Sequence, residues 1–160
     1  MSSTGQTATV PVDTVPLQAR YEIATSPVTA PDAHVLAQIR FGAATACGQD
    51  PRLLELALPP LAEGGLLETW RCPEVVRHGW RDGIGYAQTP EVLFFQLLLA
   101  EPGYPSLEAA SADAYRRLLL FLADAGYPHL LRVWNYFPRI NQGEGESERY
   151  QQFCVGRGRM

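Results

Sequence analysis

The sequence contains no lysine and no extended run of basic residues. Its thirteen basic residues are all arginine, and seventeen acidic residues leave a net charge of −4. Proteins that hold nucleic acid through its phosphates normally present clustered cationic side chains. The sequence therefore argues against a nucleic-acid partner. We attribute the exclusive use of arginine mainly to a GC-rich coding sequence.

Cysteine is scarce, and its spacing excludes two common uses of the residue. Cys47, Cys72 and Cys154 are odd in number and far apart, and they form no Cys-x-x-Cys pair. A disulfide framework and a zinc site are both disfavoured, and a reducing compartment is expected. The three histidines also lack the spacings that metal ligands use. We expect no bound metal.

Long apolar runs and complete nucleotide-binding motifs are absent as well. The longest apolar run, near residues 92–100, is too short to cross a bilayer, and the N-terminus does not resemble a signal peptide. We therefore expect a cytoplasmic protein with no membrane partner. No Gly-x-Ser-x-Gly motif is present, and the glycine-rich pieces GIGYA and GEGESE are incomplete as dinucleotide fingerprints.

The composition that remains is that of a globular domain. With 160 residues, 46% apolar and 19% charged, the chain can bury one core. We expect a disordered tail over residues 1–16 and one domain over residues 17–160. Apolar runs and two-residue alternation predict strands, which are expected at 17–25, 37–41, 53–58, 66–72, 91–99 and 129–137. The segment 37–41 could also form a short helix, and the run 91–99 is expected to be buried on both faces.

Two local signals are stronger. Arg81-Asp82-Gly83 predicts the turn of a hairpin, because an Asp-Gly pair tolerates positive φ angles. Ser106 and Gly126 are the expected caps of a helix whose apolar residues recur every three or four positions. Together these elements predict an α+β fold, with a mixed or antiparallel sheet and one or two helices packed on one face.

The most informative stretch lies near the C-terminus. A predicted strand ends near Phe137, a polar loop rich in Gly, Asn and Glu follows, and a short helical pattern runs from Ser147 to Gly156. Loops of this length often bind ligands. Three glutamates in the loop, at positions 144, 146 and 148, are more simply explained as a solvated surface.

This stretch resembles a known family. The sequence HLLRVWNYFPRINQGEGESERYQQFCVGR is similar to the central signature of the chorismatases, which include hydroxybenzoate synthases acting on chorismate. The matching residues are Leu130, Arg132, Trp134, Asn135, Tyr136, Ile140, Asn141, Glu148, Arg149, Tyr150, Phe153, Gly156 and Arg157. The segment VRHGWRDGIGYA and the helix before Gly126 lie in the expected order. Cys154 occupies a position where some relatives have Asn.

The resemblance implies the fold, the ligand and the chemistry. It implies a degenerate RidA/YjgF-like N-terminal domain that forms one wall of a cleft for chorismate or a similar dicarboxylate. Arg149, Tyr150 and Arg157 would bind the substrate, without metal or redox cofactor. The general acid would be a glutamate of a C-terminal half of similar size, and no residue of this sequence matches it. We therefore expect the chain alone to be inactive. Without the resemblance, Arg149 would be a surface arginine and Tyr150 a buried neighbour of Phe153.

Two other hypotheses remain open. The chain could be a non-catalytic binding domain that pairs with a separate RidA-like chain or with its own copies, because loss of a second half would expose apolar surface. It could also be a fragment with no independent role.

Overall fold

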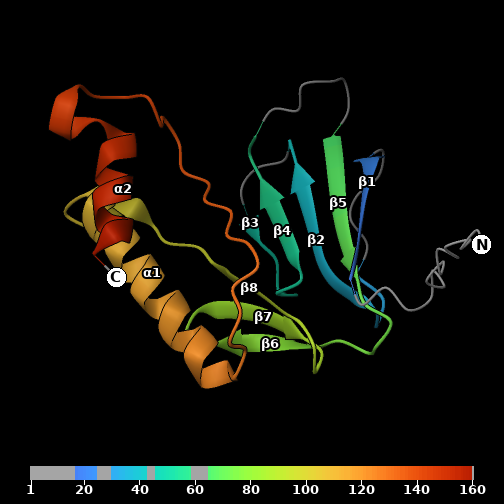
Figure 1. Ribbon diagram of the computed structural model, residues 1–160. Helices are drawn as coiled ribbons and strands as arrows, with labels where there is room; N and C mark the ends of the chain where they lie inside the picture. The colour runs from blue at the N-terminus through green and yellow to red at the C-terminus, as the bar shows by residue number, and fades with distance from the viewer. Residues whose placement is uncertain (1–16, 25–29, 43–45, 59–64, 160) are drawn as a thin grey trace, which may run out of the picture. The chain divides into compact units, whose positions relative to one another are not determined.

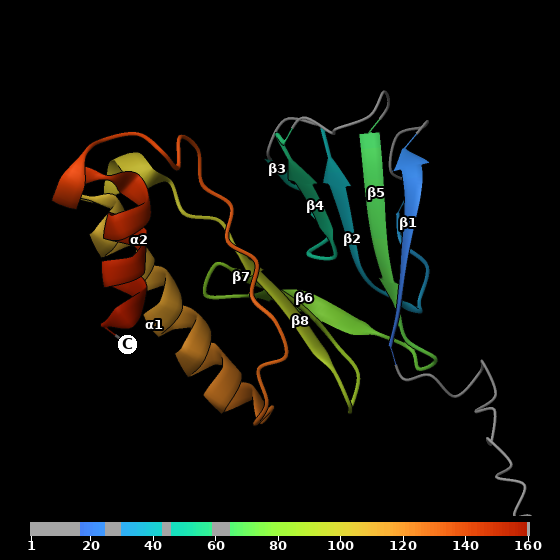
Figure 2. The same ribbon diagram turned by 45° about the horizontal axis from the view of Figure 1, so that its top comes forward.

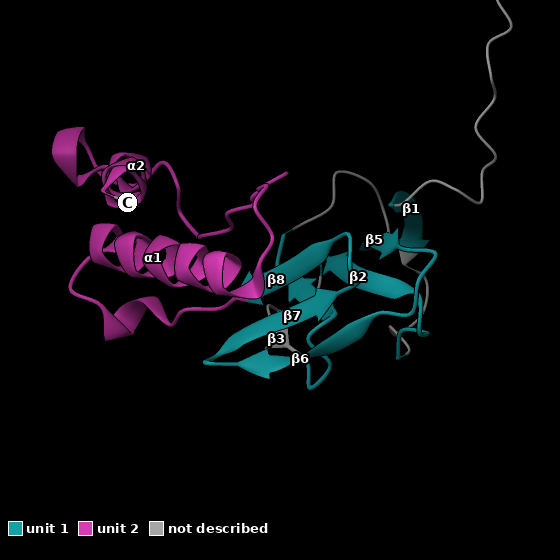
Figure 3. Cartoon of the chain, turned by 60° about the horizontal axis from the view of Figure 1, so that its bottom comes forward, with its two compact units in different colours: residues 1–96 teal, residues 97–160 magenta. Residues whose placement is uncertain are grey.

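The computed structural model describes residues 17–24, 30–42, 46–58 and 65–159. The chain divides into two compact units, residues 1–96 and 97–160, shown in different colours in Figure 3. Each unit is described here by itself. The predicted disordered tail, residues 1–16, lies outside the described residues, and the single domain over 17–160 remains a prediction.

The first unit contains a five-stranded mixed sheet (Figure 1). Its strands are β1 (Gln18–Ala24), β2 (Val35–Phe41), β3 (Ala46–Cys47), β4 (Leu53–Leu56) and β5 (Gly65–Arg71), in the order β1-β5-β2-β4-β3. The pair β2 and β4 is parallel, and the other pairs are antiparallel. Four strands predicted from alternation are therefore confirmed, and the segment 37–41 is a strand rather than a helix.

A second sheet of three strands completes this unit (Figure 2). It consists of β6 (Arg77–Arg81), β7 (Ile84–Gln88) and β8 (Leu93–Leu97), in that order. Asp82 and Gly83 connect β6 to β7 with φ angles of 53° and 76°. Positive φ at both central residues is the geometry of a two-residue hairpin turn. The predicted hairpin is confirmed.

The expectation for residues 91–99 is partly wrong. The strand β8 begins only at Leu93, and within it only Gln96 is buried. A turn occupies the preceding residues, because the Thr89 hydroxyl accepts from the backbone N–H groups of Glu91 and Val92. The other four residues of β8 are partly exposed, so the strand is not fully buried on both faces.

The core of the first unit lies where β2 meets the hairpin. Its buried members are Leu36, Cys72, Val76 and Ala87, and Leu17, Trp70, Val92 and Phe94 pack against them. Burial raises the pKa of the Cys72 thiol to about 11, so this group stays protonated at neutral pH and serves as a small apolar side chain.

The second unit is helical. Its α-helices are α1 (Leu107–Ala125) and α2 (Arg149–Gly158), and short 3₁₀ helices cover Glu101–Gly103 and Gly145–Ser147. The predicted caps of α1 are confirmed. The Ser106 hydroxyl accepts from the Ala109 N–H at 3.1 Å, and Gly126 has a φ of 80°.

The two α-helices pack on one another, and a glycine sets how closely they approach. A methyl group placed on Gly156 would overlap the backbone carbonyl oxygen of Glu108 and lie 2.8 Å from the Ser111 Cβ. The contact between α1 and α2 therefore requires glycine at this position.

The predicted strand at residues 129–137 is wrong. No strand is assigned to residues 127–138, which connect α1 to the loop before α2. Side chains hold this connection, since the Tyr115 hydroxyl donates to the Asn135 Oδ1 and the Arg132 guanidinium lies over the Trp134 ring. An apolar alternation shows which residues could share a face, but a strand also needs a partner strand.

The predicted α+β class is confirmed by two sheets and two α-helices. Among the described residues, no helix is long and apolar enough to span a membrane.

Candidate functional site

Arg149, at the first position of α2, holds an internal carboxylate. Its Nη1 and Nη2 donate to the two carboxylate oxygens of Glu101, each at 2.7 Å, and its Nε donates to the Pro138 carbonyl oxygen at 3.1 Å. Only 12% of the Arg149 side chain is exposed. The fork expected to face a substrate thus has a partner within the second unit. Its role in substrate binding remains a prediction.

This pair changes the titration of both groups. The Arg149 hydrogen bonds hold the pKa of the Glu101 carboxyl below its ordinary value, and they raise the pKa of Arg149. A two-pronged pair of this kind fixes orientation as well as charge. It anchors the first turn of α2 to the residues before α1.

Tyr150 and Arg157 are placed differently from Arg149. The Tyr150 side chain is 50% exposed, and Arg157 is exposed with its guanidinium 5.6 Å from the Phe153 ring centre. Seven residues separate the two, which is close to two helical turns, so they share one side of α2 at a spacing of about 10 Å. Arg149 lies about 100° away around the same helix. Two of the three predicted residues therefore lie on one side of the helix, two turns apart.

Phe153, not Tyr150, is the buried aromatic residue of α2. Its ring lies 4.9 Å from the Phe137 ring and 6.3 Å from the Tyr115 ring. The alternative in which Tyr150 packs against Phe153 on a buried face is therefore wrong, and so is the reading of Arg149 as a surface arginine. Binding of a substrate by Tyr150 remains a prediction.

The loop before α2 is held by hydrogen bonds among its own residues. The Gln142 carbonyl oxygen accepts from the Arg149 N–H at 2.9 Å, and the Ser147 hydroxyl donates to the Glu144 carbonyl oxygen at 2.7 Å. Gly143 has a φ of 99°, a conformation that few residues other than glycine adopt. Glu144 and Glu146 are exposed, in agreement with a solvated surface, whereas Glu148 is partly buried.

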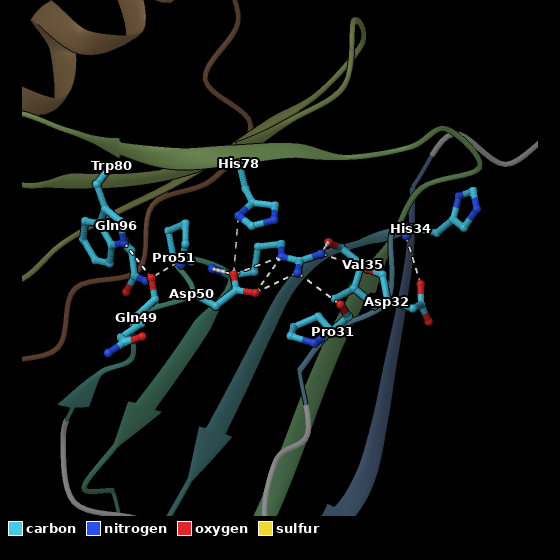
Figure 4. A network of polar contacts seen from close by, with 11 residues as sticks. Pro31, Asp32, His34, Val35, Gln49, Asp50, Pro51, His78, Trp80 and Gln96 are labelled. Atoms are coloured by element: carbon cyan, nitrogen blue, oxygen red, sulfur yellow. Dashed lines mark hydrogen bonds and ion pairs between the residues drawn. The ribbon is translucent and has the colours of Figure 1, made fainter.

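The first unit contains a second polar cluster, centred on the buried Arg52, which directly precedes β4. Figure 4 labels the residues around it, among them Asp50, Asp32 and Pro31. The Arg52 side chain is 7% exposed. Its Nε and Nη2 donate to the Asp50 carboxylate at 3.0 and 2.7 Å, and Nη1 donates to the Asp32 carbonyl oxygen at 2.8 Å. The Pro31 carbonyl oxygen accepts from Nη2 at 3.1 Å. These acceptors are needed because a buried guanidinium without hydrogen-bond partners would lower the stability of the fold.

The residues next to Arg52 connect three elements of the first unit. The Trp80 indole N–H donates to the Gln49 carbonyl oxygen at 2.9 Å, and the Gln96 amide donates to the Pro51 carbonyl oxygen at 2.7 Å. Figure 4 shows these side chains converging on the loop that carries Asp50. The loop is thereby fixed to the hairpin and to β8.

His78 lies next to this cluster. Its Nδ1 lies 3.7 Å from the Asp50 Oδ1, on the side of the hairpin that faces the loop. Burial alone would raise the pKa of Asp50, but the hydrogen bonds from Arg52 outweigh it and lower that pKa. Asp50 is therefore ionised at neutral pH, and its charge is already balanced by Arg52. The arrangement is that of a structural clamp.

Sequence reasoning did not find this clamp. The spacing Asp50-Pro51-Arg52 places the carboxylate and the guanidinium two residues apart, and that local signal was available in the sequence. The carbonyl acceptors belong to Pro31, Asp32 and, at 3.5 Å, Val35, in a separate segment that no motif indicates. Among the described residues, no group of three or more potential ligand side chains could hold a metal ion.

Comparisons with known proteins agree with one another on one family, and they concern mainly residues 68–160. Residues 68–160 match the family model described as chorismatase FkbO/Hyg5-like, N-terminal. A chorismatase of Streptomyces rapamycinicus is 35% identical over 91 residues, covering 56% of this chain and 27% of that protein. A 3-hydroxybenzoate synthase of Streptomyces hygroscopicus is 36% identical over 108 residues, covering 67% of this chain and 31% of that protein.

A solved structure extends the similarity to most of the chain. A chorismatase crystal structure has a TM-score of 0.72 and 28% sequence identity, and the match covers 89% of this chain and 44% of that one. The chain thus spans less than half the length of the relatives it matches. The matched family model covers the hairpin, both α-helices and the loop between them, and this chain belongs to the chorismatase family, in which it corresponds to the N-terminal part.

Proposed function

We propose that this chain is the N-terminal domain of an enzyme that cleaves the enolpyruvyl ether of chorismate, and that it contributes one wall of the substrate cleft. The observation that supports the proposal most is the family match over residues 68–160, which includes the whole segment that presents Tyr150 and Arg157. Chorismate carries two carboxylates, and an exposed guanidinium on the same side of α2 as a phenol is suited to bind one of them.

In the proposed reaction, Tyr150 and Arg157 bind and orient the substrate but do not transfer the proton. A general acid protonates the enol methylene group, and water or a ring hydroxyl then captures the resulting oxocarbenium-like carbon. With water the products are pyruvate and a dihydrodiol, and without net hydration they are pyruvate and a hydroxybenzoate. Arg157 binds a carboxylate and Tyr150 orients it through its hydroxyl. Neither supplies the proton to carbon, which we assign to the second half of the full-length enzyme.

Binding of a substrate carboxylate by Arg149 would require that Arg149 release Glu101. Its two terminal nitrogens already hold Glu101, so a substrate carboxylate could bind there only by taking over those hydrogen bonds. We propose that Arg149 instead positions α2 and so orients Tyr150. A Glu101→Gln variant distinguishes the two roles of Arg149. If a substrate carboxylate takes the place of Glu101, the variant should bind a chorismate analogue more tightly. If Arg149 positions α2 through Glu101, the variant should bind the analogue more weakly.

The first experiment is a test of turnover. The purified chain is mixed with chorismate, and pyruvate is followed with lactate dehydrogenase and NADH. We expect no release above the uncatalysed rate, because the proposal assigns the general acid to the second half. Sustained turnover would show that the acid lies within these 160 residues.

A second candidate function is that of a non-catalytic domain that pairs with a separate RidA-like chain. The observation that favours it is apolar exposure on α1, where Leu119 and Leu120 are 41% and 60% exposed. Size-exclusion chromatography with and without a RidA-like chain tests it. A shared peak that a Leu120→Glu variant abolishes supports pairing, and separate elution at all concentrations argues against it.

A further inference from the structure

Arg139 lies in a turn that Arg149 holds at both ends. The Arg149 Nε donates to the Pro138 carbonyl oxygen at 3.1 Å, and the Arg149 backbone N–H donates to the Gln142 carbonyl oxygen at 2.9 Å. The Gln142 N–H closes the turn by donating to the Arg139 carbonyl oxygen at 2.9 Å. The turn is therefore fixed to the first residue of α2 by contacts that do not involve the Arg139 side chain.

The backbone of Arg139 has a conformation that arginine rarely adopts. Its φ angle is 57°, in the left-handed region that favours glycine, asparagine and aspartate. Of the described residues other than glycine, only Asp82 shares a positive φ, and Asp82 belongs to a hairpin turn. Unfavourable backbone conformations of this kind are concentrated at ligand-binding and active sites. The conformation therefore indicates a role for the Arg139 side chain beyond the turn itself.

The Arg139 guanidinium is available to an anion. The residue is exposed, and no described side chain forms a hydrogen bond or an ion pair with it. Its charge helps to lower the pKa of the Glu101 carboxyl, but both Glu101 oxygens already accept from Arg149. The loop glutamates, Glu144 and Glu146, are exposed and are not paired with it. Two guanidinium groups thus share the single carboxylate of Glu101, and the charge of Arg139 is left for a ligand.

The position of Arg139 relative to Arg157 suits a small dicarboxylate. The Arg157 guanidinium lies 5.6 Å from the Phe153 ring centre, so its charge is about one turn nearer the start of α2 than its own backbone. Phe153 is four residues from Arg149, a rise of about 6 Å along the helix axis. Because the turn with Arg139 is bonded to Arg149, two flexible cationic side chains lie at neighbouring levels of α2.

We propose that Arg139 binds one carboxylate of the substrate while Arg157 binds the other. This inference rests on the proposed function, which supplies a ligand with two carboxylates. Arginine suits the task because its planar fork can donate two parallel hydrogen bonds to one carboxylate. Arg149 is then a positioning residue, since it holds the turn that carries Arg139 while its own guanidinium stays on Glu101.

Titration of the full 160-residue chain with chorismate, followed by isothermal titration calorimetry, tests the inference. Arg139→Asn removes the guanidinium and introduces a residue that tolerates the left-handed conformation. Its Kd should be about tenfold higher than that of the wild type, because charged hydrogen bonds are lost. Its urea midpoint should equal or exceed the wild-type value, which separates loss of binding from damage to the fold. Arg139→Lys keeps the charge without the fork and should raise Kd by about threefold.

A double variant tests whether the two arginines hold different carboxylates. Independent contacts multiply their effects on Kd, so Arg139→Asn combined with Arg157→Ala should bind about a hundredfold more weakly than the wild type. The control is Arg159→Asn, which removes one positive charge from an exposed position at the end of α2. This control should leave Kd unchanged.

Equal Kd values for the wild type and Arg139→Asn would overturn the inference and leave the proposed function standing. A double variant that binds no more weakly than Arg157→Ala alone would also overturn it. Weaker binding by Arg139→Asn together with a lower urea midpoint would assign Arg139 to the fold rather than to the ligand. A wild-type chain that shows no saturable binding of chorismate would contradict the proposed function and the inference together.

Discussion

The Arg149 guanidinium holds the Glu101 carboxylate, 48 residues away in sequence, through two hydrogen bonds of 2.7 Å. The pair joins the residues before α1 to the first turn of α2. We expect Arg149→Ala to lower the free energy of unfolding by about 2 kcal/mol, because the Glu101 carboxylate loses both of its charged hydrogen bonds. Arg159→Ala, which removes an exposed pair with Glu108, should cost less than about 1 kcal/mol. Urea denaturation followed by circular dichroism compares them, and equal losses would contradict the assignment.

The same pair predicts a dependence on pH. Because Arg149 depresses the pKa of Glu101 below its ordinary 4.5, the folded state holds fewer protons than the unfolded state in mild acid. The stability contributed by Glu101 is therefore present above pH 4.5 and is lost as the pH falls through the lower folded value. The difference in unfolding free energy between the wild type and Glu101→Gln should be largest near neutral pH and should shrink in acid. A difference independent of pH would show that charge is not involved.

Arg52 should be among the least replaceable charged residues of the first unit. Arg52→Ala leaves the Asp50 carboxylate and several carbonyl oxygens without their donor, and we expect a loss of about 3–5 kcal/mol. Arg40, whose ion pair with Glu55 is 3.8 Å long and partly exposed, provides the control, since Arg40→Ala should cost at most about 1 kcal/mol. Thermal or urea unfolding gives both values. Similar losses would mean that the clamp adds little beyond an ordinary surface pair.

Two glycines of α2 allow a matched test of helix packing. Gly156→Ala forces a methyl group against the Glu108 carbonyl oxygen, and we expect it to cost about 1–3 kcal/mol. Gly158 has no atom within 4 Å of the corresponding methyl position, so Gly158→Ala should be neutral or stabilising by up to about 1 kcal/mol. If both substitutions stabilise the protein, α1 and α2 do not approach as closely as described.

Sequence reasoning succeeded where the signal was local. The caps at Ser106 and Gly126 and the turn at Asp82-Gly83 each depend on residues a few positions apart, and the structure has both features. The strand predicted at residues 129–137 is wrong. An alternating apolar segment forms a strand only next to a partner strand, and the alternation does not show whether such a partner exists.

The candidate site was predictable only in part, for the same reason. The resemblance identified the segment of Tyr150 and Arg157, and the helical period places them on one side of α2. The pairing of Arg149 with Glu101 and the carbonyl acceptors around Arg52 connect residues distant in sequence, and no spacing rule indicates such contacts.

The central claim, that the exposed side of α2 forms part of a chorismate site, is tested most directly by titrating the isotope-labelled chain with chorismate and following its backbone amide resonances by NMR. The account predicts saturable shifts concentrated between Tyr150 and Arg157, strongly reduced in Arg157→Ala and unchanged in the control Arg159→Ala. Shifts confined to other parts of the chain, or equal shifts in both variants, would contradict it.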